Sequence, residues 1–267
     1  MEMRQLHTRR PSVTSLVAPS TRAALVLGAL AVLLTIPTAP TAQSTGKPYA
    51  LESAAVLRLH NVMAEPATLD GKRGLRVRLD EALRQRLESM TPQEREAAAK
   101  SGEVNEQLAV IDGLDFGNGV IEAEIAGAPR TDMFKDARGF VGIAFRVQKD
   151  LRTYDAFYLR PTNGRADDQV RRNHSAQYIS HPDWPWFRLR KETPEKYESY
   201  VDLVPGVWTR IRIEVRGAQA KLFVHGQPQP TLIVNDVKSG PTVRGAVALW
   251  IDASTDAHFR NLIVTPE

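Results

Sequence analysis

The chain of 267 residues contains no cysteine. It therefore has no disulfide framework, no thiolate ligand for zinc and no thiol nucleophile. Histidine is also sparse, with six residues, and their spacing shows no ligand cluster typical of a zinc site. No Gly-rich phosphate-binding loop and no nucleophile-elbow serine occurs either. We therefore predict no metal site and no cofactor.

Long hydrophobic runs are lacking too. The most apolar stretch runs from Ala23 to Leu34, whereas a membrane-spanning helix needs about 20 apolar residues. Four arginines precede this stretch, and residues rich in Thr, Ala and Pro follow it, which together are typical of a signal peptide. We predict a signal peptide over residues 1–42 and an exported protein, periplasmic or extracellular, with no stable membrane span after cleavage. Arg9-Arg10 leaves both the general secretory and the twin-arginine route open.

A strong excess of one charge sign is missing once this leader is removed. The full chain has a formal net charge of +4, and its first 42 residues contain four arginines and one glutamate, a net of +3. The rest of the chain is therefore at +1, and it shows no basic stripe of the kind that binds nucleic acid. We predict that nucleic acid is not a partner.

The sequence does contain a long series of short segments in which apolar and polar residues alternate. Such alternation is typical of β-strands, and turn residues such as Asp70-Gly71 and Asn163-Gly164 separate the segments. Many short strands at this spacing favour a sandwich or barrel. We predict a flexible tail over residues 43–49 and one all-β domain over residues 50–267, with strands at 56–60, 75–79, 120–125, 140–147, 154–160, 175–181, 208–215, 220–224, 231–234, 246–251 and 259–264.

Residues 81–100 interrupt this series. Apolar residues recur there at helical spacing, and Thr91, Pro92 and Glu94 have the pattern of a capping box with proline at the first helical position. The second half of the segment is nearly all polar or alanine. We predict a short helical insertion with a solvated surface, and the alternative of a lid beside a site stays open.

The alternation also divides each strand into two faces. On two successive strands the predicted core face carries Val141, Ile143, Phe145, Val147, Phe157 and Leu159. The opposite face then carries Arg146, Tyr158 and Arg160, and we call it the polar face. A sheet with one polar face of this kind is able to hold a ligand there.

The order of the strand sequences resembles the concanavalin A-like lectin/glucanase superfamily. The segments that carry the resemblance are FVGIAFR, YDAFYLRP, VWTRIRIEVRG, AKLFVHG, GAVALW and AHFRNLIV, within residues 108–265. Among its members the sequence is most similar to laminin-G-like domains and to the bacterial domains called 3-keto-disaccharide hydrolases. The resemblance implies an antiparallel jelly-roll β-sandwich, with a carbohydrate or glycan held on the concave sheet or its rim.

The sequence departs from the superfamily in its acidic residues. The retaining glucanases carry a Glu-x-Asp-x-x-Glu strand, whose carboxylates act as nucleophile and acid/base, and this motif is absent here. The nearest approach is Glu122 and Glu124, whose carboxylates would lie about 7 Å apart on one face of a regular strand. That separation is wider than the retaining mechanism uses. We keep Glu122 and Glu124 as candidate catalytic residues, with a solvated pair on a sheet face as the alternative.

Several residues on or beside the polar face are candidates for ligand binding. Arg160 is able to donate two hydrogen bonds to sugar hydroxyls, although an ion pair with Glu122 or Glu124 is an alternative. Gln177 offers a donor and an acceptor, with hydrogen bonding to the backbone as the alternative, and only one of Gln177 and Tyr178 shares the face of Arg160. Tryptophans in the proline-containing segment that follows are predicted to lie in a loop and to stack on sugar rings. The predicted ligand-binding residues are Arg146, Tyr158, Arg160, Asn163, Gln177, Trp184 and Trp186.

From these residues we predict a secreted domain that binds a carbohydrate or glycan. Two alternatives remain open. The resemblance to 3-keto-disaccharide hydrolases implies an enzyme that cleaves glycosides, and the resemblance to laminin-G-like domains implies a protein-interaction module. A closed cleft with two carboxylates would favour the enzyme, whereas a groove with aromatic residues and no carboxylate pair would favour the binding protein.

Overall fold

The structure is a computed structural model that describes residues 46–267, apart from residue 103 and residues 133–136. The chain divides into one unit of residues 1–42 and a second of residues 43–267, and the second is described below. The predicted signal peptide lies outside the described residues. Within them, no helix combines the length and the apolar composition that crossing a membrane requires.

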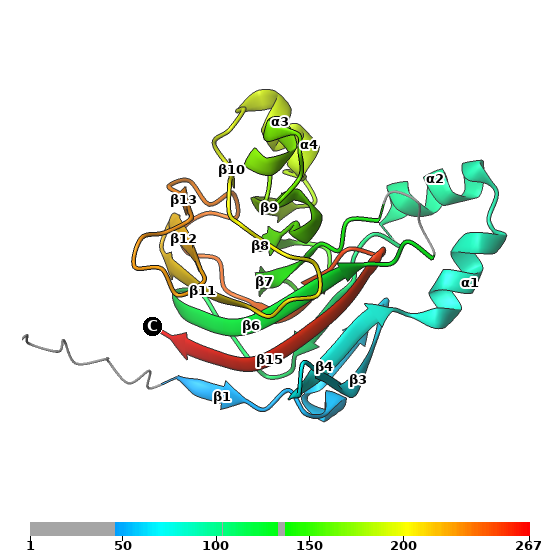
Figure 1. The fold of residues 1–267 in the computed structure, drawn as a ribbon, viewed down its shortest axis with the longest axis horizontal. Helices are drawn as coiled ribbons and strands as arrows, with labels where there is room; N and C mark the ends of the chain where they lie inside the picture. Colours follow the sequence, from blue (N-terminus) through cyan, green and yellow to red (C-terminus); the bar gives the residue numbers. More distant parts are fainter. Residues whose placement is uncertain (1–45, 103, 133–136) are drawn as a thin grey trace, which may run out of the picture. The chain divides into compact units, whose positions relative to one another are not determined.

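Two antiparallel sheets make up the domain (Figure 1). Sheet A has the strand order β13-β12-β11-β6-β15-β4-β3, with β1 also paired to β15. Its strands are β1 (Lys47–Tyr49), β3 (Val62–Leu69), β4 (Lys72–Leu79), β6 (Gly119–Pro129), β11 (Thr209–Arg216), β12 (Gln219–Val224), β13 (Leu232–Val234) and β15 (Thr255–Pro266). Lys47–Tyr49 was predicted to belong to the flexible tail, and its pairing with β15 corrects that prediction.

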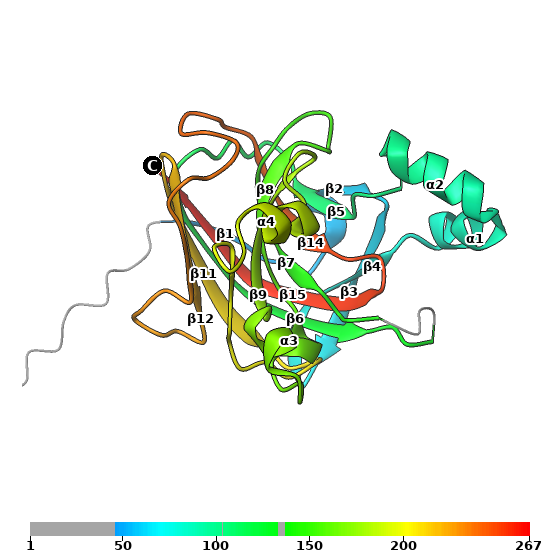
Figure 2. The ribbon, with the colours of Figure 1, turned by 90° about the horizontal axis from the view of Figure 1, so that it is seen from above.

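Sheet B has the strand order β10-β9-β8-β7-β14-β5-β2. Its strands are β2 (Leu57–His60), β5 (Leu108–Ile111), β7 (Val141–Val147), β8 (Tyr154–Leu159), β9 (Ala176–His181), β10 (Glu198–Ser199) and β14 (Ala246–Ile251). Figure 2 shows β7, β8 and β9 crossing over the long strands β6 and β15 of sheet A. The predicted all-β sandwich of antiparallel strands is confirmed.

Apolar side chains from alternate positions fill the space between the sheets. In sheet A, Ile121 and Ile125 of β6 are fully buried. In sheet B, Ile143 of β7 lies opposite Phe157 of β8, and both are buried. Burial of side chains of this size contributes roughly 1.5–3 kcal/mol each, so this layer is the main source of stability.

The hairpin of β3 and β4 illustrates both the strength and the limit of the sequence pattern. Asp70 and Gly71 both have positive φ, +49° and +72°, as a type I′ turn requires. The turn signal is therefore correct, but it joins β4 to β3, a strand that was not predicted. Pro66 interrupts the pattern of β3 and is tolerated there because β3 is an edge strand.

The predicted helical insertion is confirmed as two helices, α1 (Glu81–Ser89) and α2 (Pro92–Ser101). The capping box is present, since the backbone N–H of Thr91 donates to Glu94 Oε2 at 2.7 Å and the N–H of Glu94 donates to Thr91 Oγ1 at 3.3 Å. Leu83 of α1 and Ala98 of α2 are buried with Leu79 of β4 in a small apolar cluster. This cluster fixes the insertion to the end of sheet A.

Four further short helices interrupt the strands. They are η1 (Ala54–Val56), η2 (Pro161–Asn163), α3 (Gln169–Asn173) and α4 (Trp186–Glu192). The region after Leu108 was predicted to consist of strands, so α3 and α4 are corrections. Trp186 was predicted to lie in a loop, but it begins α4. Figure 1 shows α3 and α4 together beside β9 and β10.

A β-bulge changes the predicted faces at the end of β7. Ala144 lies opposite Ala248 of β14, but Val147 lies opposite Ala246, so β7 has one residue more than its partner. Arg146, with φ of +56°, takes up the extra residue. The bulge moves Val147 to the face of Ala144, which corrects its predicted place on the face of Ile143.

Candidate functional site

The polar face is the face of sheet B that points away from sheet A. Strand register builds it, because residues directly opposite each other in neighbouring antiparallel strands share a face. Tyr158 of β8 lies opposite Gln177 of β9, and Gln177 lies opposite Glu198 of β10. Tyr154 of β8 likewise lies opposite His181 of β9. The sequence left open whether Gln177 or Tyr178 shares the face of Tyr158 and Arg160, and the register selects Gln177.

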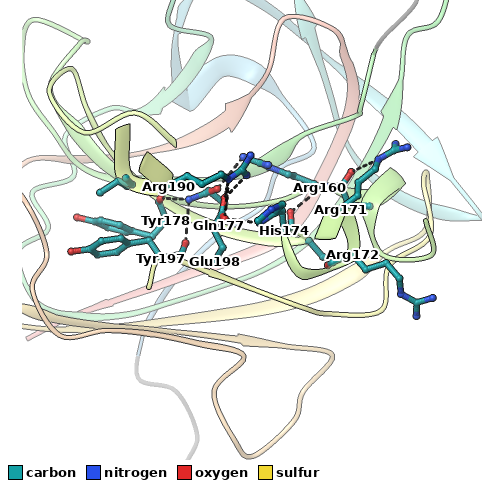
Figure 3. Close-up of polar contacts among 12 residues, drawn as sticks. Arg160, Arg171, Arg172, His174, Gln177, Tyr178, Arg190, Tyr197 and Glu198 are labelled. Atoms are coloured by element: carbon teal, nitrogen blue, oxygen red, sulfur yellow. Dashed lines mark hydrogen bonds and ion pairs between the residues drawn. The ribbon is translucent and has the colours of Figure 1, made fainter. Parts of the chain in front are cut away.

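Arg160 is the centre of the polar contacts on this face (Figure 3). Its Nη2 donates to the hydroxyl of Tyr158 at 2.6 Å and to Oε1 of Gln177 at 3.0 Å. Gln177 in turn donates through Nε2 to the backbone carbonyls of Tyr178 and Tyr197. Among the described residues no partner engages Nε of Arg160. This Nε is buried, and Nη1 likewise makes no hydrogen bond within the described part of the chain, so Nη1 is the donor left for a ligand.

Three aromatic rings surround this guanidinium group. The central carbon of Arg160 lies 5.0 Å from the ring centre of Phe140, 5.2 Å from that of Tyr158 and 5.4 Å from that of Trp186. These are cation–π distances. Arg190 of α4 lies over Trp186 as well, at 4.7 Å. Tyr158 is buried, but Trp186 is 42% exposed, so one ring of the group is offered to solvent.

Glu198 balances the positive charge beside Arg160. Its carboxylate accepts hydrogen bonds from Arg190 and lies 2.5 Å from Nδ1 of His174 (Figure 3). Burial lowers the pKa of His174, which the carboxylate of Glu198 opposes only in part. His174 is therefore neutral at pH 7. Because the carboxylate of Glu198 is almost fully buried and already paired, its role here is to hold Arg190 and α4 in place.

A glycine makes room for the aromatic pair in the middle of the face. Gly142 of β7 lies between Tyr158 of β8 and Trp250 of β14, opposite both of them. The two rings meet across it with their centres 4.7 Å apart. A methyl group at Gly142 would lie 2.2 Å from the backbone oxygen of Phe157 and 2.6 Å from Cβ of Tyr158. Only glycine fits this position without displacing the ring of Tyr158.

A second polar group lies on the same face, at the end of β8 away from Arg160. The hydroxyl of Tyr154 donates to Oε2 of Glu106 and accepts from Nε1 of Trp250 at 3.0 Å. Nδ1 of His181 lies 3.0 Å from Oε1 of Glu106, and the rings of Tyr154 and His181 stack with centres 5.1 Å apart. Burial raises the pKa of Tyr154 well above its ordinary value, and Glu106 raises it further, so Tyr154 stays protonated and donates.

Glu122 and Glu124 are not part of this face. They belong to β6 in sheet A, where Glu122 is within 3.6 Å of Arg210 and Glu124 accepts from Nδ2 of Asn261 at 2.7 Å. The buried residues between the sheets separate them from Arg160. The prediction that they lie near the ligand face is therefore wrong, and so is the alternative that they form an ion pair with Arg160.

Arg146 does not join Arg160 either. It is buried, and it donates to three backbone carbonyls, those of Gly117, Gly217 and Gly240. Its Nη1 also lies 4.0 Å from the carboxylate of Asp155. Because every one of these partners is internal, the bulge has turned Arg146 away from the polar face and into a structural role.

Asn163 also has internal partners. Its Nδ2 donates to the carbonyl of His174 at 3.2 Å, and its Oδ1 accepts from Nε of Arg171 at 3.1 Å. Both ends of the amide are therefore occupied, and the residue is buried. Asn163 joins η2 to α3 and leaves no amide group directed at a ligand.

The two tryptophans of the predicted loop are separated in the structure. Trp186 stacks on Arg160, as described above. Trp184 instead packs between Arg188 and Lys238, whose cationic groups lie 4.0 Å and 4.6 Å from its ring centre. It pairs by a β-bridge with Ser180 and contacts the core. Only Trp186 remains as a candidate for stacking on a ligand.

Sequence reasoning missed four residues of this face, namely Phe140, Glu106, His181 and Trp250. The alternation of β9 places His181 on the face of Gln177, so a signal for His181 was present. Glu106 precedes β5 without any periodic pattern, and only the fold brings it to His181. Within the described residues no group of three His, Asp or Glu side chains is able to hold a metal ion.

No family model matches the chain, and no curated protein matches it. Solved structures are similar to it in fold. A carbohydrate-binding module, CBM66 from Bacillus subtilis, is 11% identical, with 77% of this chain and 95% of that chain covered and a TM-score of 0.45. The Bacillus licheniformis beta-glucanase is 13% identical, with coverages of 84% and 100% and a TM-score of 0.41.

A third similar structure is the Caenorhabditis elegans galectin LEC-6, at 13% identity, with 60% of this chain and 96% of that chain covered and a TM-score of 0.36. These similarities concern the arrangement of strands. They assign no ligand and no reaction to this chain.

Proposed function

We propose that this domain binds a carbohydrate or glycan on the polar face of sheet B, at the group formed by Phe140, Tyr158, Arg160, Gln177 and Trp186. One observation carries the proposal. The exposed ring of Trp186 lies beside the guanidinium group of Arg160, whose Nη1 makes no hydrogen bond among the described residues. An apolar ring next to directed hydrogen-bond donors matches the two surfaces of a sugar, its C–H face and its hydroxyls.

Preorganisation supports this proposal. Arg160 is held by two hydrogen bonds and three rings, so a ligand would meet it in a fixed orientation and little side-chain entropy would be lost on binding. Trp186 is held by Arg160 on one side and Arg190 on another. The orientations of Arg160 and Trp186 are therefore set before a ligand binds.

The proposed site differs from the predicted one in composition. Tyr158, Arg160, Gln177 and Trp186 remain from the predicted set, and Phe140 is added. Arg146, Asn163 and Trp184 are left out because their polar groups or rings have internal partners. Of the retained residues, Trp186 is the one whose removal leaves the fold least affected, because it is the most exposed.

A glycan array probed with the full chain and with Trp186→Ala tests the proposal. We expect the wild type to bind one class of glycan, and Trp186→Ala to weaken that binding at least about tenfold, which corresponds to about 1.4 kcal/mol. Tyr200→Ala is the matched control, because Tyr200 is equally exposed but stacks on Arg172, away from Arg160.

Two outcomes would contradict the proposal. Undiminished binding by Trp186→Ala would move the site elsewhere. A wild type that binds no glycan would favour the protein-interaction alternative. Analysis of the array products for cleavage would test the glycoside-cleaving alternative in the same experiment. The proposal also includes export, on the strength of the predicted signal peptide, and fractionation of expressing cells would test it.

A further inference from the structure

Glu106 and His181 form the most distinctive group that the proposed binding site does not use. The carboxylate of Glu106 is buried and His181 is 21% exposed in its side chain, so the acid lies behind an imidazole that reaches solvent. They come from different parts of the fold, since Glu106 precedes β5 and His181 ends β9. A carboxylate that holds an imidazole from behind is the arrangement that orients a catalytic histidine.

The hydrogen-bond pattern fixes the tautomer of His181. An ionised carboxylate only accepts, and Tyr154 already donates its hydroxyl hydrogen to Oε2 of Glu106. Nδ1 lies 3.0 Å from Oε1 and 3.2 Å from the Tyr154 hydroxyl, and with Glu106 ionised neither group has a hydrogen left to donate, so the hydrogen is on Nδ1. Nε2 therefore carries the lone pair. Within the described residues no hydrogen bond engages this Nε2, so it is free to accept a proton.

The dyad lies at one end of a row of side chains on the polar face. The row runs through Tyr154, Trp250 and Tyr158, and its other end is Arg160. Tyr154 and Tyr158 are four residues apart on one face of β8, which is about 13 Å. Trp250 connects them, because its Nε1 donates to Tyr154 and its ring stacks on Tyr158. A saccharide of more than one unit that binds at Trp186 would therefore extend along the row toward His181.

We propose that Glu106 and His181 form a general-base dyad that hydrolyses acyl esters carried by a saccharide bound along this row. The proposal rests on the proposed glycan-binding function for its substrate. Imidazole is the most common general base in enzymes, and activation of water for attack on an ester carbonyl needs a single base that can later return its proton. Glu106 would be the positioning residue and would stabilise the imidazolium ion.

The proposed reaction is balanced without a further reagent. Nε2 of His181 takes a proton from a water molecule, whose oxygen forms a bond to the acyl carbon. The bond between that carbon and the sugar oxygen then breaks, and the sugar oxygen receives the proton from Nε2. The products are a carboxylic acid and a free sugar hydroxyl, and His181 returns to its starting tautomer.

Hydrolysis of p-nitrophenyl acetate by the full chain tests the dyad independently of the glycan. We expect measurable turnover by the wild type, and a loss of about 10²-fold in His181→Gln. His225→Gln is the matched control, because His225 is exposed and its ring hydrogen-bonds to the backbone carbonyl of Asp202, outside the dyad. Thermal unfolding of each variant separates loss of the base from loss of the fold. Turnover by His181→Gln at the wild-type rate, or no turnover by a folded wild type, would overturn the proposal.

The dependence of the rate on pH tests the positioning role of Glu106. The titratable groups that contact His181 within the described residues are Glu106 and Tyr154, and His60 lies near Glu106. In Glu106→Gln the imidazolium ion of His181 loses its counter-charge. We therefore expect a lower rate of hydrolysis and a pH–rate profile that is shifted to lower pH. An unchanged profile would exclude the positioning role.

The proposed binding function is tested separately. Trp186→Ala should lose the release of acetate from acetylated xylo-oligosaccharides, whereas Tyr200→Ala, which lies outside both proposed sites, should keep it. Retained acetate release by Trp186→Ala would show that the dyad acts without the proposed binding site. Loss of p-nitrophenyl acetate hydrolysis and of acetate release in His181→Gln would support the dyad.

Discussion

Arg146 and Asp155 face each other at 4.0 Å with both side chains fully buried. The pair lies at the end of the sandwich, where Arg146 also binds the carbonyls of Gly117, Gly217 and Gly240. Because a buried charge is tolerated only when its partners are complete, this pair joins three loops into one structure.

Replacement of Arg146 by methionine is expected to destabilise the protein by about 3–5 kcal/mol, because it leaves the buried carboxylate of Asp155 uncompensated. Urea unfolding measures the change. Arg165→Ala is the control, since Arg165 and Asp202 form an exposed ion pair and its loss should cost about 1 kcal/mol or less. Equal effects of the two substitutions would show that Arg146 is no more important than a surface residue.

Gly142→Ala is expected to destabilise the protein by about 1–3 kcal/mol, because the added methyl group would overlap the backbone oxygen of Phe157 and Cβ of Tyr158. The displaced ring of Tyr158 would also lose its stacking on Trp250. Thermal unfolding and glycan binding measure the two effects. Wild-type stability in Gly142→Ala would mean that β7 and β8 are further apart than described.

Arg160→Ala is expected to cost stability as well as glycan binding, since it leaves the hydroxyl of Tyr158 and Oε1 of Gln177 without their donor. A loss of about 1–3 kcal/mol is the usual consequence for each buried group. Arg160→Lys keeps the charge but loses the planar group that lies among the rings, so it should stay folded and still bind at least about tenfold more weakly. Wild-type affinity in a folded Arg160→Lys would exclude Arg160 from the site.

Asp236 is expected to contribute acid-dependent stability. Burial alone would raise its pKa, but hydrogen bonds from Tyr197, Lys196 and Lys238 outweigh burial and lower the pKa to about 2. Because the folded pKa is below the ordinary value of 3.8, the contribution is present above pH 4 and is lost as the pH falls toward 2. The side chain is 40% exposed, so solvent screening reduces the size of the effect.

Asp236→Asn measures this contribution. The midpoint of urea unfolding should be lower than that of the wild type at pH 6, and the difference should shrink toward pH 2. A difference that is independent of pH would mean that the carboxylate of Asp236 has the same pKa in the folded and unfolded protein.

The sequence by itself determined the class of fold, because alternation of apolar and polar residues is a local property that only a half-buried strand satisfies. It also placed Tyr158 and Arg160 on one face, since strand phase is fixed by counting residues within a strand. The capping box of Thr91 and Glu94 was equally local and equally readable.

Only the tertiary structure decided which strands are neighbours. Glu122 and Glu124 have the phase of an outer face, but sequence phase does not say which sheet a strand joins, and theirs is sheet A. Arg146 has the phase of the polar face until one extra residue in β7 reverses it. Glu106 meets His181 over a separation of 75 residues, and no periodic pattern encodes a contact of that range.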